Sequence, residues 1–493
     1  MSMEGSRKAL QSTLGALSAL AVAALGGVAR WLPTNLKVML GVNVGLSILG
    51  YIAMASISRT LGDTFIKANL RGIDLNKQTT KRDGDGNLVR PIEGIPIPES
   101  QGTIAAAVYI LLLSVFIPFA FARENLELFP HNEMAEYLAA VLTITFASFM
   151  GFADDVLDLR WRYKIPLPFL ATLPLLLVYY ANGNETGVMV PNQLRWLFGD
   201  AIDLGVFFYA FLLILAVFST HAINIYAGVN GLEVGQAVVI AGSVLLLNII
   251  QLHRIPDQYK NYRDSHVQSI FLIVPFLAVS MSLLRLNWFP ATVFVGDTYC
   301  YFAGMTLAVV SIIGHISKTM VLLLIPQVLN FLYSCPQLFS FMGIPCPRHR
   351  MPAYNASNGT VCNSYAEFKP SELKPLGLLV FTVLKSLRLV HLKPGKEEGS
   401  VMMSNLTLIN FVLYAYGPIA AIPISAMPII LHPLIFFAKL SKMSDFVLLM
   451  AILVGRVVKY SIMAQMALTA PHLLKFFGAS QEVIQQVKKT KAN

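Results

Sequence analysis

Windows of about 20 mainly apolar residues recur along this chain, and they constrain its fold more than any other feature. A hydrocarbon core of about 30 Å requires roughly that many helical residues. The windows lie near residues 36–58, 103–122, 135–152, 165–181, 203–221, 232–252, 267–285, 301–315, 318–335 and 444–467. Only 13% of the 493 residues are charged, whereas about a quarter of an ordinary globular chain is charged. We therefore predict an all-α polytopic membrane protein of about ten transmembrane helices, with a small mixed α/β cytosolic insertion between the last two.

The apolar windows divide the chain into five regions. We expect an N-terminal extension over 1–33, a nine-span core over 34–335, a cytosolic loop over 336–404, a proline-rich interfacial or re-entrant segment over 405–443, and a last span with a basic tail over 444–493. The extension suits a signal sequence, an extra span or a surface helix equally. In the proline-rich segment, prolines recur every five residues and each removes a helix hydrogen-bond donor, so a true span there is the lesser alternative.

Most lysines and arginines lie in the loops after spans 1, 3, 5, 7 and 9. By the positive-inside rule, these odd-numbered loops face the cytosol. The net charge of +10 is then explained by the basic loops that orient the chain in the membrane, and we expect no nucleic-acid partner. The sequon at Asn184 falls in an even-numbered loop and is a candidate glycosylation acceptor.

The third loop opens with Asp154, Asp155 and Asp158, and Lys164 follows shortly after. Carboxylates beside cations at a helix end suit a divalent metal with bound phosphate, or a proton acceptor whose pKa is set by its neighbours. A solvated acidic helix end is an equally good interpretation of this motif taken alone.

The fifth and seventh loops add amides, glycines and one carboxylate. Asn224 offers a neutral oxygen ligand to Mg²⁺, and Gly228 permits close backbone approach to a ligand. Asn230 is followed by glycine, which a simple turn also explains. Asp297 follows Phe294 at the entry of a span, where a helix N-cap is the simpler interpretation.

The ninth and first loops complete the set. Arg348, His349 and Arg350 lie between prolines and form a stiff cationic fork suited to phosphate oxygens, although a positive-inside anchor is the alternative. Leu75 and Glu99 lie in the first loop, where linker chemistry alone explains them. Alternation of the spans places all five clusters on one face. Together they predict a cytosolic site that holds an anionic, metal-chelated substrate at the membrane boundary.

In order along the chain, the motifs GIDLNK, PESQG, FADDVLDLRWRYK, INIYAGVNGLEVGQ, FVGDTYCYFAGM and PRHRMP form a specific set. With them the chain resembles the polyprenyl-phosphate N-acetylhexosamine-1-phosphate transferase superfamily, and within it the eukaryotic enzymes that act on dolichyl phosphate. The resemblance runs from about Leu61 to Pro418 and over the last span.

The resemblance implies a role for each matching residue. Its catalytic residues would be Asp154, Asp155, Lys164 and Arg348, its metal ligands Asn224 and Asp297. Its substrate-binding residues would be Leu75, Glu99, Gly228, Asn230 and Phe294 around uridine, with His349 and Arg350 facing the sugar. The two metal ligands would also meet the pyrophosphate of the sugar nucleotide, and the paired aspartates would lie beside the attacking lipid phosphate.

The implied reaction transfers N-acetylglucosamine-1-phosphate from UDP-N-acetylglucosamine to dolichyl phosphate, the first step of lipid-linked oligosaccharide assembly. The resemblance implies Mg²⁺, with Mn²⁺ as an alternative. It also implies a location in the endoplasmic reticulum membrane, among membrane lipids, with a cytosolic active site, and it leaves a homodimer open.

We favour direct in-line attack, because a phosphate with a second pKa near 6 is largely dianionic at cytosolic pH. A covalent aspartyl-phosphate intermediate is the rival mechanism, and a nucleotide-sugar transporter is the alternative function.

Some positions depart from the superfamily pattern. The superfamily usually has Asn where His221 stands, so the role of this imidazole is open. The insert over 83–95 and the segment over 419–438 lie outside the shared motifs, and no chemistry is assigned to them.

Overall fold

A computed structural model of the chain describes residues 10–12, 14–15, 25–27, 33–74, 94–121, 130–184, 186–190, 195–256, 258–339, 342–347, 350–355, 360–417 and 419–420. The predicted tenth span over 444–467 and most of the N-terminal extension and proline-rich segment lie outside these residues.

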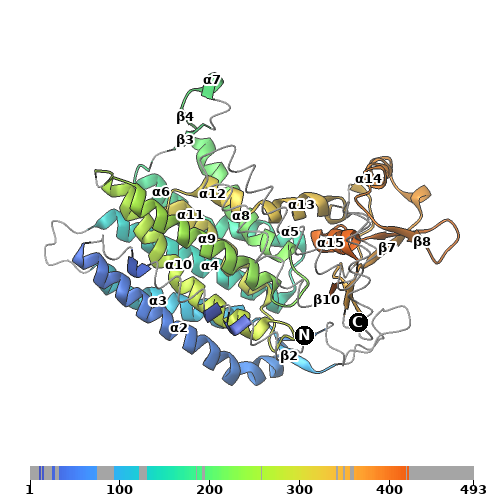
Figure 1. Ribbon diagram of the computed structural model, residues 1–493, viewed down its shortest axis with the longest axis horizontal. Coiled ribbons are helices and arrows are strands. Elements are labelled where there is room, and N and C mark those ends of the chain that lie inside the picture. Colours follow the sequence, from blue (N-terminus) through green and yellow to red (C-terminus); the bar gives the residue numbers. More distant parts are fainter. Residues whose placement is uncertain are drawn as a thin grey trace, which may run out of the picture. The chain divides into compact units, whose positions relative to one another are not determined.

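Long apolar helices dominate the described part of the chain (Figure 1). Eight of them are long and apolar enough to cross a membrane. They are α2 (Thr34–Lys67), α3 (Gly102–Phe121), α4 (His131–Leu157), α6 (Pro166–Ala181), α8 (Val206–Ile225), α9 (Leu232–Arg254), α10 (Lys260–Asn287) and α11 (Gly296–Ile313). The span that contains α6 begins before that helix and covers Arg162–Ala181. The prediction of a polytopic, mainly helical membrane protein is confirmed, because each of the first eight apolar windows falls on one of these helices.

The ninth window corresponds to a broken helix rather than a straight one. Helix α12 (Ser317–Leu323) and helix α13 (Ile325–Leu338) meet at an angle of 61°. Pro326 lies in the first turn of α13, where proline is tolerated because that N–H has no helical partner. Proline cannot continue α12 through the break, so the second half of the span takes a new direction.

Helix α11 is at the centre of the bundle and contacts α3, α4, α6, α8, α9 and α10. Glycines allow this close packing. A Cβ atom added at Gly151 of α4 would lie 2.7 Å from the Cα of Thr298, and one added at Gly102 of α3 would collide with the backbone of Tyr299. On α11 itself, a Cβ atom at Gly304 would collide with the backbone of α8. The first turn of α11 is therefore held between α3 and α4.

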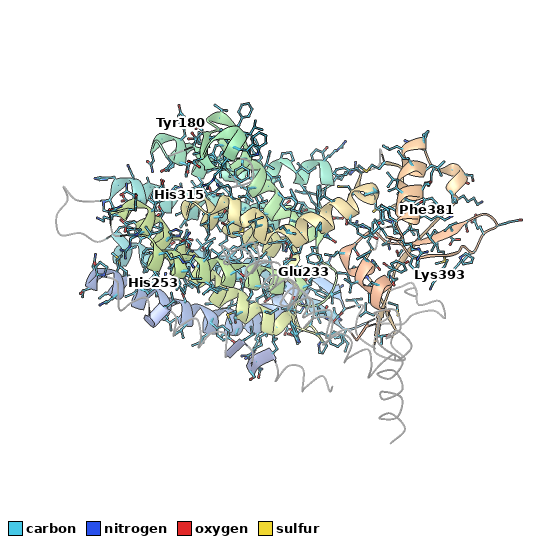
Figure 2. All side chains as sticks on the ribbon, turned by 45° about the horizontal axis from the view of Figure 1, so that its top comes forward. Tyr180, Glu233, His253, His315, Phe381 and Lys393 are labelled. Carbon is cyan, nitrogen blue, oxygen red and sulfur yellow. The ribbon has the colours of Figure 1, made fainter. Side chains whose placement is uncertain are left out.

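Short elements connect the long helices at both ends. At one end these are β1 (Arg71–Ile73), β2 (Pro96–Pro98) and α5 (Trp161–Lys164), and in the loop between α6 and α8 they are β3 (Gly187–Met189), α7 (Arg195–Phe198) and β4 (Ala201–Asp203). Strands β1 and β2 pair antiparallel, as do β3 and β4. Figure 2 shows Tyr180, His253 and His315 together at one end of the bundle and Glu233, at the start of α9, toward the other.

After α13 the chain forms a small α/β insertion. Its elements are β5 (Ala353–Asn355), β6 (Thr360–Cys362), β7 (Tyr365–Phe368), η4 (Pro370–Glu372), α14 (Pro375–Ser386), β8 (Leu392–Pro394), β9 (Val401–Ser404), α15 (Leu408–Tyr416) and β10 (Ile419–Ala420). One three-stranded antiparallel sheet has the order β7-β9-β8 and the other β10-β6-β5. Phe368, Phe381 and Met403 belong to the buried apolar core of this insertion.

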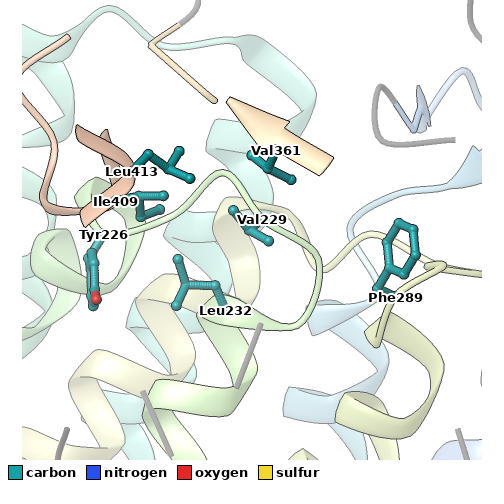
Figure 3. Packing of buried hydrophobic residues seen from close by; sticks show 7 residues of the cluster. All are labelled: Tyr226, Val229, Leu232, Phe289, Val361, Ile409 and Leu413. Carbon is teal, nitrogen blue, oxygen red and sulfur yellow. The ribbon is translucent and has the colours of Figure 1, made fainter. Parts of the chain in front are cut away.

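A second apolar cluster joins the insertion to the loop after α8 (Figure 3). Its buried side chains are Tyr226, Val229, Leu232, Phe289, Val361, Ile409 and Leu413. They come from the fifth loop and the start of α9, from the seventh loop, from β6 and from α15. Because burial of apolar surface is worth about 25 cal/mol per Å², this contact holds the ninth loop against the fifth.

Candidate functional site

One ammonium group joins two carboxylates at the end of the bundle where α4 ends and α11 begins. The Nζ atom of Lys164, on α5, lies 2.9 Å from Oδ1 of Asp154 and 2.9 Å from Oδ2 of Asp297. The Asp154 side chain is fully buried, whereas 26% of the Asp297 side chain is exposed. The two carboxylates, one from α4 and one from α11, therefore contact the same ammonium group, and the Asp297 side chain stays partly exposed.

Asn224 lies in the last turn of α8 and contacts the same carboxylate. Its Nδ2 group donates a hydrogen bond of 2.6 Å to Oδ1 of Asp297. This bond leaves the Asn224 carbonyl oxygen as a ligand atom beside the carboxylate. The third, fifth and seventh loops therefore meet at Asp297.

Asp155 has a different environment from its neighbour Asp154. Its Oδ1 accepts the backbone N–H of Asp297 at 2.6 Å, and its Oδ2 accepts the N–H and the hydroxyl of Thr298. The first N–H groups of a helix have no partner within the helix, so Asp155 caps α11 from α4. Gly296 precedes these residues with φ +73°, and a Cβ atom there would collide with the Asp155 carboxylate.

The first loop lies next to the seventh. Phe294 donates its backbone N–H to the carbonyl of Pro98 at 2.8 Å, and a Cβ atom at Gly72 would lie 2.7 Å from the Phe294 ring. Glu99 lies beside them, and the pKa of its carboxyl group is raised, first by burial and then by the charges of Asp155 and Asp297.

The fifth loop joins the first through a buried hydrogen bond. Nδ2 of Asn230 donates to Oδ2 of Asp74 at 2.8 Å, and both side chains are buried. Gly228 has φ +111° and donates its N–H to Glu233 at 3.3 Å. A Cβ atom at Gly228 would lie 2.9 Å from Cγ of Met351 in the ninth loop, so the backbone here has close neighbours on two sides.

Of the three candidate residues in the ninth loop, Arg350 is the one that lies within the described residues. Its carbonyl oxygen accepts hydrogen bonds from Ser364 and Asn410, both at 3.2 Å. Burial lowers the pKa of the Arg350 guanidinium. Its Nη1 atom is buried without a hydrogen-bond partner in the described part of the chain, as expected of a group prepared for an anionic or hydroxyl-bearing ligand.

The structure thus brings together at one end the described candidate residues of loops 1, 3, 5 and 7, and loop 9 contacts loop 5 next to them. The expectation that the odd-numbered loops share a face is confirmed by these contacts. Leu75, Arg348 and His349 lie outside the described residues. His221 is buried on α8, and its ring packs edge-on against Tyr301 at 5.7 Å between centroids.

The donor atoms at this end suit a hard divalent cation. Carboxylates of Asp154 and Asp297 already converge on one ammonium group, and Asn224 adds an amide oxygen; carboxylate and amide oxygens are ligands that Mg²⁺ accepts. Across the described ranges, His, Cys, Asp and Glu side chains form no group of three that could hold a metal ion by themselves. A metal here would take further ligands from an anionic substrate, as is usual for Mg²⁺ in phosphate chemistry.

Several residues that build the site were not singled out from the sequence. Asp74 and Gln236 occur only within the quoted motifs, and Asn330 lies outside them. Gln236 donates to the carbonyl of Tyr226 at 2.8 Å, and Asn330 donates to that of Ile225 at 3.2 Å. A polar side chain inside an apolar window is costly unless it is bonded, and this was the signal that could have identified both amides.

Comparison with known proteins gives a consistent set of relatives. The family model described as "Glycosyl transferase family 4" matches residues 137–315. UDP-N-acetylglucosamine--dolichyl-phosphate N-acetylglucosaminephosphotransferase of Saccharomyces cerevisiae is 42% identical over 397 residues, covering 76% of this chain and 84% of the yeast protein. The Schizosaccharomyces pombe protein of the same name is 39% identical over 398 residues, covering 76% and 85%. The Dictyostelium discoideum protein of that name is 44% identical over 352 residues, covering 68% and 79%.

Proposed function

This chain belongs to the UDP-N-acetylglucosamine--dolichyl-phosphate N-acetylglucosaminephosphotransferase family, and from that membership we propose the following reaction and site. The enzyme transfers N-acetylglucosamine-1-phosphate from UDP-N-acetylglucosamine to dolichyl phosphate. The products are dolichyl-diphospho-N-acetylglucosamine and UMP. The observation that carries this proposal is the bridge from Lys164 to Asp154 and Asp297. It places an ammonium group and two carboxylates together at the end of the helix bundle, and such groups suit a phosphate with a bound metal ion.

Glycosyl-1-phosphate transferases of this family generally use a divalent metal ion. For this chain we assign Mg²⁺, with Mn²⁺ as the alternative, to Asp297 and Asn224. When bound, the ion neutralises the charge that builds up on the transferred phosphoryl oxygens. Asp155 fixes the backbone of Asp297 through its bonds to the first turn of α11, so the main chain of the residue that would hold the ion is anchored to α4.

On the acceptor side, Asp154, Asp155, Lys164 and Arg348 handle the lipid phosphate. An oxygen of dolichyl phosphate attacks the β-phosphorus of the sugar nucleotide, a new phosphorus–oxygen bond forms, and the bridging bond to the α-phosphate breaks to release UMP. Lys164 and Arg348 neutralise phosphate charge, and Asp154 orients the acceptor or takes up a residual proton. Both oxygens of Asp155 are already hydrogen-bonded to α11, which speaks against this residue as a covalent nucleophile.

On the donor side, two groups of residues read the nucleotide and the sugar. The uridine pocket consists of Leu75, Glu99, Gly228, Asn230 and Phe294, and the sugar is met by His349 and Arg350. The hydrogen bond from Asn230 to Asp74 supports this assignment, because it fixes the fifth loop against the first. The unbonded Nη1 of Arg350 is available to a sugar or phosphate oxygen.

The protein is a membrane protein whose relatives are named for a glycosylation reaction. We further assign it to the endoplasmic reticulum membrane with the site facing the cytosol, since the odd-numbered loops carry most of the lysines and arginines. A homodimer is compatible with this assignment.

The proposal is tested with purified protein, a panel of UDP-sugars, and dolichyl phosphate added or omitted. We expect lipid-linked product, identified by mass spectrometry, from UDP-N-acetylglucosamine and at least tenfold less from UDP-glucose or UDP-galactose. Uptake of UDP-N-acetylglucosamine into proteoliposomes without lipid-linked product would instead indicate the nucleotide-sugar transporter, which the relatives do not support.

A further inference from the structure

Helix α13 carries four polar side chains on one face. They are Gln327, Asn330, Ser334 and Gln337, spaced by three and four residues, and each is almost fully buried. Residues at this spacing lie above one another on a helix. Polar groups in apolar surroundings are costly unless they form hydrogen bonds. The hydrogen-bond partners of these four side chains therefore indicate what the stripe does.

The first part of the stripe holds the end of α8. Nε2 of Gln327 donates to Oε1 of Gln236 at 2.7 Å. In turn, Nε2 of Gln236 donates to the carbonyls of Ile223 at 3.1 Å and Tyr226 at 2.8 Å. The last carbonyls of a helix have no partner within the helix, so these amides cap the turn of α8 that contains Asn224.

The last part of the stripe holds the insertion. The Ser334 hydroxyl donates to the carbonyl of Leu406 at 2.6 Å, and Gln337 accepts the N–H of Leu406 at 2.8 Å. Gln337 also donates to the carbonyl of Pro345 at 3.2 Å and to Asn405 at 3.1 Å. These contacts fix the beginning of the ninth loop and the segment that leads into α15.

Asn330 lies between the two parts and contacts both. Its Nδ2 donates to the carbonyl of Ile225, next to Asn224, at 3.2 Å. Its Oδ1 accepts the N–H of Leu408, the first residue of α15, at 2.8 Å. Two residues further along α15, Asn410 donates to the carbonyl of Arg350 at 3.2 Å.

We propose that Asn330 is a positioning residue that couples the metal-binding end of α8 to the sugar-reading ninth loop. One side chain sets the distance between the turn that bears Asn224 and the helix that fixes Arg350. This inference rests on the proposed function, which assigns metal binding to Asn224 and sugar contact to Arg350. Asn330 itself touches neither reacting group and acts only through these two segments.

The coupling makes a paired kinetic prediction. Asn330→Ala leaves the Ile225 carbonyl and the Leu408 N–H without their partner, so both segments lose their position. We expect at least a fivefold rise in the KM for UDP-N-acetylglucosamine together with at least a fivefold rise in the Mg²⁺ concentration for half-maximal rate. Gln337→Ala, which disturbs the insertion alone, should raise the KM without changing the Mg²⁺ requirement. Leu329→Ala, at an adjacent and 52% exposed position of α13, is the control and should change neither.

Hydrogen–deuterium exchange provides a measurement that does not depend on catalysis. In Asn330→Ala, exchange should increase both in residues 226–231 and in residues 408–416, and in Gln337→Ala only in the second segment. If Asn330→Ala does not fold, Asn330→Ser is used, because the shorter serine side chain weakens the hydrogen bonds to both partners, and the same pair of effects is expected at smaller size.

A change in only one of the two kinetic constants, or in only one segment, overturns the coupling while the wild-type reaction still stands. A fall in kcat with both constants unchanged overturns it as well. Absence of transfer by the wild-type protein, with the paired exchange effect present, overturns the proposed function instead.

Discussion

The carboxylate of Asp155 on α4 accepts the backbone N–H of Asp297 on α11 at 2.6 Å. This bond ties the proposed metal ligand to the neighbouring helix through its main chain, while Lys164 and Asn224 contact its side chain. Asp297 is thereby held from three directions. Preorganisation of this kind is what a phosphoryl-transfer site needs, because catalysis there is mainly positioning and charge stabilisation.

Asp155→Asn should therefore damage both stability and turnover. An amide NH₂ would face the N–H of Asp297 or Thr298 and lose at least one of the capping bonds. Loss of a helix cap costs about 1–2 kcal/mol, so we expect a lower Tm in detergent and at least a tenfold fall in kcat. Asp158→Asn, at the exposed end of the same helix, is the matched control; equal effects at the two positions would refute the capping role.

Asp297→Asn should nearly abolish UMP release. The substitution keeps the shape of the side chain but removes the charge that attracts both the metal ion and Lys164. We expect kcat to fall at least 100-fold, a size typical of removing one electrostatic contact in an active site, with little loss of Tm. Activity within tenfold of wild type at saturating Mg²⁺ would remove Asp297 from the proposed metal site.

Glu99→Gln should stabilise the protein in a pH-dependent manner. Burial and two neighbouring carboxylates raise the pKa of Glu99, so its folded form favours the proton. The folded protein therefore binds a proton at Glu99 more tightly than the unfolded chain does. The stabilisation that results is fully present below the pKa of an unfolded glutamate, about 4.3, and is lost as the pH rises through the higher pKa of the folded state. Glutamine carries no such charge, and its Tm advantage over wild type should grow between pH 4 and pH 7. A Tm difference that is constant with pH would contradict the raised pKa.

Arg350→Ala should mainly impair donor binding. A half-buried cation whose Nη1 atom is buried and unbonded in the described part of the chain is suited to a charge-assisted bond with the donor. Loss of such a bond costs about 1.5–3 kcal/mol, or roughly 10- to 150-fold in KM for UDP-N-acetylglucosamine. Arg388→Ala, an exposed cation of the same insertion, serves as the control and should bind normally. An unchanged KM in the Arg350 variant would exclude its role at the sugar.

Gly304→Ala should destabilise the bundle. The added methyl group would collide with the backbone of Ser219 and Thr220, which a rotamer change cannot relieve, and overpacking typically costs about 1–3 kcal/mol. Gly242→Ala on α9 has nothing within 4 Å of the new Cβ atom and should not lower Tm. A comparison of the two Tm values in the same detergent isolates the collision from the change in helix propensity.

Local sequence patterns predicted the spans and the shared end of the loops well. The length of an apolar window is a local property, so eight windows matched eight helices. Alternation then required the odd-numbered loops to share one end, and the contacts of Lys164 with Asp297 and of Asn230 with Asp74 agree with it. The 61° break before α13 was missed, because Pro326 sits within an apolar window that is long enough for a straight span.

The partners of individual polar side chains could not be predicted. Asp155 is next to Asp154 in sequence and carries the same group, yet one caps α11 and the other pairs with Lys164. That difference depends on how α4 crosses α11, which no local pattern contains. Similarly, Asn330 bonds Leu408 across 78 residues of chain, so its role follows only from the folded arrangement.

The most direct measurement is UMP release by the purified protein from UDP-N-acetylglucosamine, with dolichyl phosphate present or absent. With the acceptor we expect UMP and lipid-linked product in equal amounts, and without it no UMP above background. UMP released in an amount equal to the enzyme without dolichyl phosphate would contradict direct attack by the lipid phosphate. Absence of UMP in the presence of both substrates and Mg²⁺ would contradict the transferase itself.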